Sequence, residues 1–311
     1  MMRGAESAPA QPLASVVIIA YNCADYAGQA IRSVLGQTWI HLELIVVDDG
    51  STDRTPEVVR SIDDSRLRYV RQKNSGPNAA RNEGIRQARG DFIAFLDCDD
   101  WWLPAKLERQ LARAIDHPEI GLVYSLAARV DTSGRPGDRF ASIVEGRVLD
   151  RLLLGNCIAG SASSAMVTRR AIEAVGTFDE SLHYAEDWEY WIRIASQFEV
   201  ACVPEFDVYL LDRPGSQGKN AKATRRDSLR FIHAALARYA PSRPFFRRMA
   251  LAQLHYVASY NLWASGLLWD ARRELLWSLA YNPLHLTYYK RMVRLFFPKR
   301  QKRDTPSRDT A

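Results

Sequence analysis

Hydrophobic and polar residues alternate with two different periods over the first 130 positions. Continuous apolar runs of strand length, SVVIIAYN at 15–22 and LELIVVDD at 42–49, are typical of strands buried on both faces of a parallel sheet. Further strands are predicted at 66–72, 91–99 and 120–130, and helices at 25–35, 51–60, 78–88 and 104–115. This order predicts an α/β fold with a doubly wound, mostly parallel sheet flanked by helices.

The pattern becomes less regular beyond residue 130. Residues 131–147 are rich in Gly, Pro, Arg and Ser and are predicted to form a loop. A strand at 163–168, a helix at 186–197 and a strand at 199–211 follow. Beyond residue 216 the apolar residues recur only at helical spacing, at Leu229, Ile232, Leu236 and Tyr239 and again at Leu286, Tyr289, Val293 and Phe296. The last of these segments has Lys290, Arg291 and Arg294 on its other face, which predicts a basic amphipathic helix.

These patterns divide the chain into four parts. We expect a flexible tail at 1–14, an α/β domain at 15–215, a basic and aromatic-rich helical appendage at 216–298, and a disordered basic tail at 299–311. The length of 311 residues agrees with one large domain and an appendage.

Composition and charge sharpen this division. Hydrophobic residues make up 47% and charged residues 25% of the chain, which excludes disordered, collagen-like and disulfide-scaffold proteins. Residues 1–215 hold 23 Lys and Arg against 31 Asp and Glu, a net charge of −8, whereas residues 216–311 hold 19 against 5, a net charge of +14. The basic part also holds 14 of the 32 aromatic residues. Such a segment is typical of proteins that contact an anionic membrane, a nucleic acid or an acidic partner.

Two features bear on location. The run at 249–269 has no charged residue, but it contains Gln253, His255 and Asn261, which are costly in hydrocarbon and argue against a spanning helix. The four cysteines are scattered without a C-x-x-C pair, so the sequence suggests neither a zinc site nor a disulfide framework. We therefore expect the protein to lie in the reducing cytoplasm. Peripheral attachment to the inner face of the cell membrane is an additional hypothesis.

Carboxylates gather at three places along the α/β part. Residues 48–53 (DDGSTD) and 97–100 (DCDD) each follow a buried strand, at the sheet edge where α/β proteins bind ligands. Three carboxylates within 97–100 repel one another unless a divalent cation such as Mg²⁺ or Mn²⁺ neutralises them. The third group is Glu186-Asp187. A helix cap, a solvated turn and a surface ion-pair helix are the respective structural alternatives.

Taken together and in order, these segments resemble the inverting glycosyltransferases of family 2, which have the GT-A fold. The resemblance runs from SVVIIAYN through NSGPNAARNEGIRQARGDFIAFLDCDDWWLP to FDESLHYAEDWEYWIRIA and covers about residues 15–215. It implies that Tyr21 and Asp49 hold the nucleotide base, and a phenol ring and a carboxylate suit that role. It also implies that Arg81 faces the donor phosphates, although a helix-surface ion pair is an alternative for this residue.

The remaining site residues follow from the same resemblance. Asp97 and Asp99 match the D-x-D motif, with Asp99 as the metal ligand and Asp97 shared between the metal and the donor ribose. Asp187 matches the catalytic base, with Glu186 beside it. Where similar proteins often have a His before Pro-Gly-Ser, this chain has Arg213, which can serve the phosphates but cannot ligate a metal.

The resemblance implies transfer of a sugar from a nucleotide-diphosphate sugar, of UDP or dTDP type, to an acceptor hydroxyl by metal-assisted single displacement. The expected cofactor is Mn²⁺ or Mg²⁺, the expected acceptor is a glycan or lipid-linked glycan of the cell surface, and no nucleic acid is expected. Residues 216–311 are the expected contact with an anionic membrane; the alternative is that their aromatic residues pack on the catalytic domain and their charges stay solvated.

Two other classes of function remain as alternatives. A sugar-phosphate nucleotidyltransferase would be expected to have a glycine-rich phosphate loop after the first strand, where this chain reads AYNCADY. A non-catalytic protein that binds membranes or nucleic acid would be explained by the basic segment alone, which carries no nucleic-acid-binding motif.

Overall fold

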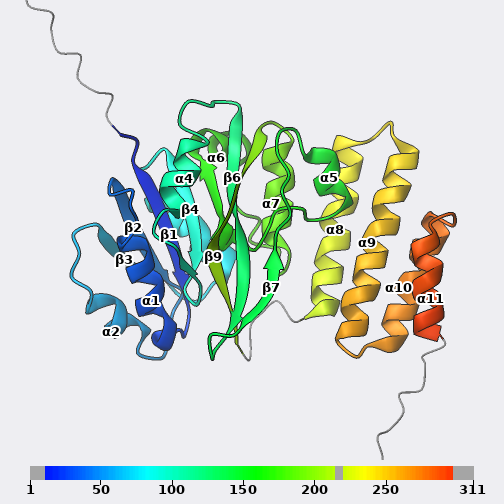
Figure 1. The fold of residues 1–311 in the computed structure, drawn as a ribbon, viewed down its shortest axis with the longest axis horizontal. Helices are drawn as coiled ribbons and strands as arrows, with labels where there is room; N and C mark the ends of the chain where they lie inside the picture. Colours follow the sequence, from blue (N-terminus) through cyan, green and yellow to red (C-terminus); the bar gives the residue numbers. More distant parts are fainter. Residues whose placement is uncertain (1–10, 214–219, 297–311) are drawn as a thin grey trace, which may run out of the picture. The chain divides into compact units, whose positions relative to one another are not determined.

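Figure 1 shows the computed structural model, which describes residues 11–213 and 220–296. The chain divides into two compact units, residues 1–239 and 240–311, and each is described by itself. Residues 1–10 of the predicted flexible tail and the whole predicted tail at 299–311 lie outside the described residues.

The first unit alternates strands and helices. Its strands are β1 (Ala14–Ala20), β2 (Leu42–Asp48), β3 (Leu67–Arg71), β4 (Phe92–Asp97), β5 (Trp101–Trp102), β6 (Ile120–Asp131), β7 (Pro136–Phe140), β8 (Ala165–Thr168) and β9 (Glu199–Asp212). Its helices are α1 (Ala24–Leu35), α2 (Thr55–Arg60), α3 (Pro77–Gln87), α4 (Lys106–Ala112), α5 (Leu149–Leu154), α6 (Arg169–Val175), α7 (Glu186–Ala195) and α8 (Ala221–Tyr239), with a 3₁₀ helix η1 (Ala162–Ser164).

All these strands form one mixed sheet in the order β3-β2-β1-β4-β8-β6-β9-β5, with β7 paired to β6. β1 pairs in parallel with β2 and β4, β2 with β3, and β6 with β9. The central strand β8 is antiparallel to both of its neighbours, so β4 and β6 run in the same direction. Because β1 and β2 are almost wholly buried, their sequences read as continuous apolar runs. The predicted α/β fold with a mostly parallel sheet is confirmed.

The prediction that residues 131–147 form only a loop is wrong. Residues 136–140 form strand β7, which pairs antiparallel with β6. β7 is exposed along most of its length and pairs at one side, so it has no alternating apolar pattern to reveal it, and such an edge position tolerates Pro136.

Helix α8 belongs to the first unit, although we expected the helical appendage to begin at residue 216. It packs on α5 and α7, where the ring of Phe231 meets that of Trp188 edge to face at 5.2 Å. The second unit starts only at Ala240, after this contact.

The second unit contains α9 (Pro244–Ala264), α10 (Leu268–Tyr281) and α11 (Leu286–Phe296), with α10 packed on both of the others. Its small core is built on Ala252, Leu275, Tyr288 and Leu295. Within it, His255 Nδ1 and a carboxylate oxygen of Glu274 form a buried pair at 2.7 Å. In the described part of the chain, no helix is both long enough and apolar enough to span a membrane.

Candidate active site

The ends of the parallel strands place the candidate residues at one edge of the sheet. The register of β1 sets Ala20 against Asp48 of β2 and Ile19 against Asp97 of β4. The segments that follow these strands therefore begin side by side. They carry Tyr21, Asp49 and Asp99, and Asp97 is the last residue of β4, so these side chains lie at the sheet edge expected from the sequence.

The D-D-G-S loop is held by a dense set of hydrogen bonds. Buried Asp49 accepts hydrogen bonds from Gln72 Nε2 at 2.7 Å and from the backbone nitrogens of Ser75 and Gly76 at 2.9 and 2.8 Å. It thereby fixes the segment that leads into α3. Gly50 has a φ of 78°, and a Cβ there would lie 2.8 Å from the Asn74 nitrogen, so the close approach of these two loops requires glycine.

The loop after β1 is bound to the same segment. Asn22 has a φ of 47°, its backbone nitrogen donates to Ser51 Oγ, and its side-chain oxygen accepts from the Thr52 nitrogen at 2.8 Å. Tyr21, the residue before Asn22, is 48% exposed at the sheet edge. Within the described residues, no hydrogen bond or ion pair joins Tyr21 or Asp49 to the carboxylates of the D-x-D motif or of Glu186-Asp187, the E-D motif.

Each carboxylate of the D-C-D-D segment has its own partner. Arg81 Nη2 donates to Asp97 Oδ1 at 2.9 Å, and Arg213 Nε donates to Asp99 Oδ2 at 2.7 Å. Asp100 is buried and accepts from Ser163 Oγ at 2.6 Å and from the Leu211 nitrogen at 3.0 Å. Burial, with repulsion from neighbouring carboxylates, raises the pKa of Asp99 despite Arg213 and raises the pKa of Asp100 well above its ordinary value.

Arg81 joins the D-x-D motif to the E-D motif. Its guanidinium is 5% exposed, and besides Asp97 it binds Glu186 Oε1 through Nη1 at 2.9 Å. We expected this side chain to face donor phosphates or to form a surface ion pair. The structure places it between two carboxylates that come from different elements.

Asp187 lies in the first turn of α7, two positions after Ala185, whose φ of 56° is unusual for a residue with a side chain. Its Oδ1 accepts a 2.6 Å hydrogen bond from the Trp188 nitrogen. Burial, reinforced by the charge of Glu186, raises the pKa of Asp187 to about 7. A carboxylate with such a pKa can accept a proton near neutral pH.

Known proteins match the part of the chain that carries the strand-end motifs. The family description "Glycosyl transferase family 2" matches residues 15–176, more than half of the chain. The chain belongs to glycosyl transferase family 2. The family resemblance inferred from the motifs is therefore confirmed.

Relatives named as glycosyltransferases match about half of the chain. An uncharacterised glycosyltransferase of Rickettsia typhi is 32% identical over 193 residues, which is 58% of each chain. TuaG of Bacillus subtilis, named as a candidate teichuronic acid biosynthesis glycosyltransferase, is 38% identical over 155 residues, 48% of this chain and 60% of that protein. The matches thus cover less than two thirds of the length of either relative.

Solved structures of glycosyltransferases share the fold over most of the chain. Staphylococcus aureus TarS 1–349 in complex with UDP-GlcNAc matches with a TM-score of 0.64 and 16% identity over 91% of this chain and 89% of TarS 1–349. The mannosyltransferase PcManGT of Pyrobaculum calidifontis, in complex with GDP-Man and Mn²⁺, matches with a TM-score of 0.58 and 20% identity over 93% and 85%. These likenesses confirm the predicted GT-A fold.

The D-x-D carboxylates of this family 2 protein suit a hard cation. The side chains of Asp97 and Asp99 are 29% and 19% exposed, and carboxylate oxygens are ligands that Mg²⁺ and Mn²⁺ prefer. Among the described residues, no cluster of three or more His, Cys, Asp or Glu side chains could hold a metal ion. The residues therefore fit a cation that is bound jointly by one or two carboxylates and substrate phosphates, and they do not fit a cage made by the protein alone.

A disulfide joins Cys23 to Cys98, a pairing that the scattered positions of the cysteines did not indicate. The two residues follow β1 and β4, which are parallel neighbours, and their Cα atoms lie 6.5 Å apart. A search for local C-x-x-C spacing misses a pair that only the sheet brings together. The cysteine pattern therefore gives no support to a reduced compartment.

Three positioning residues were not predicted. Ser163 Oγ accepts from the Asp97 nitrogen at 3.0 Å and donates to Asp100. Asn78 and Asn82 of α3 donate to the carbonyls of Leu182 and Phe178, and so they hold the segment that leads to α7. The N-x-x-R-N spacing around Arg81 was a signal in the sequence, but short polar residues like these are too common to be singled out.

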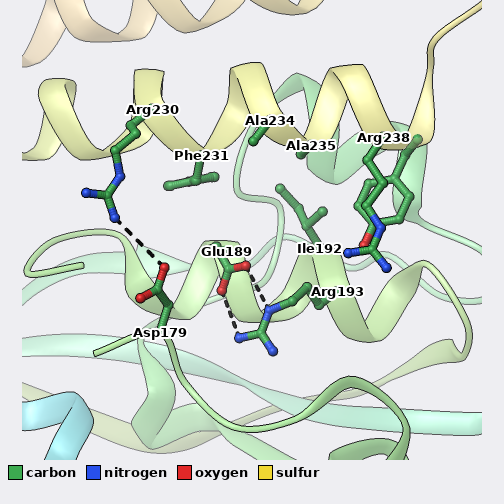
Figure 2. A pocket seen from close by; sticks show the side chains of 10 residues that line it. Asp179, Glu189, Ile192, Arg193, Arg230, Phe231, Ala234, Ala235 and Arg238 are labelled. Carbon is green, nitrogen blue, oxygen red and sulfur yellow. Dashed lines mark hydrogen bonds and ion pairs between the residues drawn. The ribbon is translucent and has the colours of Figure 1, made fainter. Parts of the chain in front are cut away.

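A groove of about 230 Å³ lies between α7 and α8, outside the candidate site (Figure 2). Its apolar lining residues include Ile192 and Phe231. Most of its charged side chains form ion pairs with one another. Arg193 binds Glu189 on α7, and Arg230 of α8 faces Asp179, as the dashed lines show. None of the predicted site residues lines it.

Proposed function

We propose that this family 2 protein is an inverting glycosyltransferase that moves a sugar from a UDP- or dTDP-type donor to an acceptor hydroxyl by a single displacement. The observation that carries the proposal is the convergence of Asp97 and Glu186 on Arg81, with Asp187 in the next position. The motif proposed for the donor and the motif proposed for the base are thereby held together. Family membership also favours this function over the nucleotidyltransferase and non-catalytic alternatives.

Asp187 is the proposed base. An acceptor hydroxyl is almost fully protonated at neutral pH, so a carboxylate must take its proton as the bond to the anomeric carbon forms. With a pKa of about 7, Asp187 is a stronger base than an ordinary carboxylate and is still substantially ionised at neutral pH. Glu186 keeps its ion pair with Arg81 and positions the first turn of α7.

Tyr21, Asp49 and Asp97 are the proposed donor contacts, with Arg213 on the diphosphate. The exposed ring of Tyr21 offers a stacking face for the base. Within the described part of the chain, Asp49 Oδ2 accepts a hydrogen bond from the Gly76 nitrogen, and its second lone pair can accept from the imide of a uracil or thymine. Asp97 stands nearer the ribose. Arg81 acts on the donor through Asp97, because its guanidinium is enclosed by carboxylates.

Asp99, together with Asp97, is the proposed site of a divalent cation, Mn²⁺ or Mg²⁺. Such a cation would stabilise the negative charge of the departing nucleotide diphosphate. The PcManGT structure, a complex with GDP-Man and Mn²⁺, supports this assignment. If UDP binds the Asp99→Ala variant and the natural protein equally well, with and without EDTA, the metal assignment is wrong.

The proposed acceptor is a glycan or lipid-linked glycan, and the proposed role is cell-surface polysaccharide synthesis. The similarity to TuaG supports this role, since that protein is named for teichuronic acid biosynthesis. The TarS complex with UDP-GlcNAc supports a nucleotide-sugar donor. The segment 131–163 is the proposed acceptor side. Within it α5 is tied to the E-D helix, because Trp188 Nε1 donates to the Leu152 carbonyl at 2.7 Å.

A screen of nucleotide sugars tests the core of the proposal. UDP-, dTDP- and GDP-sugars are added to the full chain with Mn²⁺ or with EDTA, and thermal stabilisation and sugar release are measured. We expect one UDP- or dTDP-sugar to raise the melting temperature and to be hydrolysed slowly. When the sugar is transferred to an acceptor alcohol, NMR of the glycoside should show an inverted anomeric centre. The absence of any response to all donors would contradict the proposal.

We also propose that residues 216–311 hold the enzyme at an anionic membrane, at its cytoplasmic face. This part has a net charge of +14, and its exposed aromatic residues include Phe245 and Trp269, which is 80% exposed. Aromatic rings at the headgroup level and basic residues near anionic lipid suit such an interface.

Vesicle co-sedimentation tests the membrane contact. The full chain is expected to bind phosphatidylglycerol vesicles and not phosphatidylcholine vesicles, and binding should weaken when Phe245 and Trp269 are both replaced by Ser. Ile40→Ser, at a 74% exposed apolar residue of the first unit, is the matched control and should bind like the natural chain. Equal binding by all three proteins would remove the proposal.

A further inference from the structure

Asp99 is already paired with a cation that the chain itself supplies. Arg213 directly follows β9 and donates from Nε to Asp99 Oδ2 at 2.7 Å. Its guanidinium also lies over the ring of Tyr26 in α1, 5.4 Å from the ring centroid. The carboxylate proposed for a metal ion is therefore neutralised by an arginine in this state of the protein.

The two arginines of the D-x-D segment differ in how firmly they are held. Arg81 is 5% exposed and divides its donors between two carboxylates, so its removal from Asp97 would leave buried charges unpaired. The side chain of Arg213 is 27% exposed and is next to the end of the strand. Arg213 is thus the cation that can leave its carboxylate at the lower cost.

Arg213 and a divalent cation compete for the same anions, the carboxylate of Asp99 and the diphosphate of the donor. A guanidinium binds carboxylates and phosphates with the same planar set of donors, whereas a divalent cation binds the oxygens of both. Asp99 Oδ2 cannot serve Arg213 and a metal ion fully at once. A nucleoside diphosphate offers Arg213 an alternative anion.

We propose that Arg213 occupies the metal-binding oxygen of Asp99 in the free enzyme and moves to the diphosphate when the donor binds, which releases Asp99 for the divalent cation. This exchange couples the two ligands, because each removes the obstacle to the other. The inference rests on the proposed function, in which a nucleotide diphosphate and a cation share this site.

Binding of Mn²⁺ to the full chain tests the exchange, by electron paramagnetic resonance with and without UDP. We expect weak Mn²⁺ binding without UDP, and about tenfold tighter binding of Mn²⁺ to Arg213→Gln under the same conditions, a factor typical of coupled sites. UDP should strengthen Mn²⁺ binding to the natural chain, and this enhancement should be about tenfold smaller in Arg213→Gln. The second result separates the exchange from simple loss of a positive charge, which would leave the enhancement unchanged.

Two control variants keep the test sharp. Arg213→Lys retains a cation for Asp99 and should bind Mn²⁺ without UDP like the natural chain. Arg86→Gln removes the exposed partner of Glu83 on α3 and should also behave like the natural chain. If UDP and Mn²⁺ bind together but Arg213→Gln leaves Mn²⁺ affinity without UDP unchanged or lower, the exchange is wrong and the proposed function stands. If UDP and Mn²⁺ do not bind to the natural chain even together, the proposed function and the exchange both fail.

Discussion

Asp97 and Glu186 are bound to the same guanidinium, although they belong to β4 and α7. Each accepts a 2.9 Å hydrogen bond from a different terminal nitrogen of Arg81. The side chain of Arg81 is almost fully buried, so water cannot take its place as the partner of these two carboxylate oxygens. The relative position of the two motifs therefore depends on one side chain of α3.

Arg81→Gln should destabilise the protein. Removing one member of a buried ion pair leaves the other charge uncompensated, and we expect the free energy of unfolding to fall by about 3 kcal/mol in urea titrations. Arg86→Gln, in the exposed pair with Glu83 on the same helix, should change it by less than about 0.5 kcal/mol. Equal effects of the two variants would contradict the linking role of Arg81.

Asp187→Asn should abolish transfer without abolishing donor binding. The amide cannot take the acceptor proton, so the rate should fall by a factor of about 10² to 10⁴, while the affinity for the nucleotide stays within about twofold. Rates are measured with the donor found in the screen. Glu189→Gln, two positions further along α7 and paired with Arg193, is the control and should retain most of the activity.

The transfer rate should rise with pH and level off above about pH 7. Burial and Glu186 raise the pKa of Asp187 to about 7, and only the ionised carboxylate can act as a base. Below this pKa the protonated fraction grows, so at pH 6 the rate should be about a tenth of the plateau value. A rate that is constant from pH 5.5 to 8 would exclude Asp187 as a base with a raised pKa.

Reduction of the Cys23–Cys98 disulfide should lower stability. The bond closes a loop of 75 residues, and the chain-entropy model gives about 4 kcal/mol for such a loop. Cys23→Ser or a reducing agent should therefore lower the melting temperature, whereas Cys157→Ser, at a free cysteine, should leave the response to reductant intact. Two reactive thiols at positions 23 and 98 in the unreduced protein would show that the bond does not form.

Gly84→Ala should destabilise the first unit through overpacking. A Cβ at this position of α3 would lie 2.1 Å from Val17 Cγ1 in β1, so the helix would have to move away from the sheet. We expect a loss of about 1 to 3 kcal/mol in the free energy of unfolding. Gly155→Ala is the control, because nothing lies within 4 Å of its added Cβ, and its stability should stay near that of the natural chain.

The regular elements were predictable where burial leaves a clear pattern. β1 and β2 are buried on both faces, and the amphipathic helices α7 and α8 show their apolar spacing in the sequence. β7 was missed because an exposed edge strand needs no apolar residues, and the two-residue β5 is too short to have a period. The first unit ends at Tyr239, whereas the sequence placed the end of the α/β domain at residue 215. Only the tertiary structure shows that α8 packs on α5 and α7.

The sequence by itself determined the family, the fold class and the carboxylates at the strand ends, because these depend on local apolar runs and on short motifs in a fixed order. Only the tertiary structure decided which charges meet. Arg81 lies between Asp97 and Glu186, Arg213 lies on Asp99, and Cys23 reaches Cys98. These contacts join positions far apart in the chain. They depend on how the strands align and on which side chains are buried together, and the local periodicity of the sequence contains no information about either.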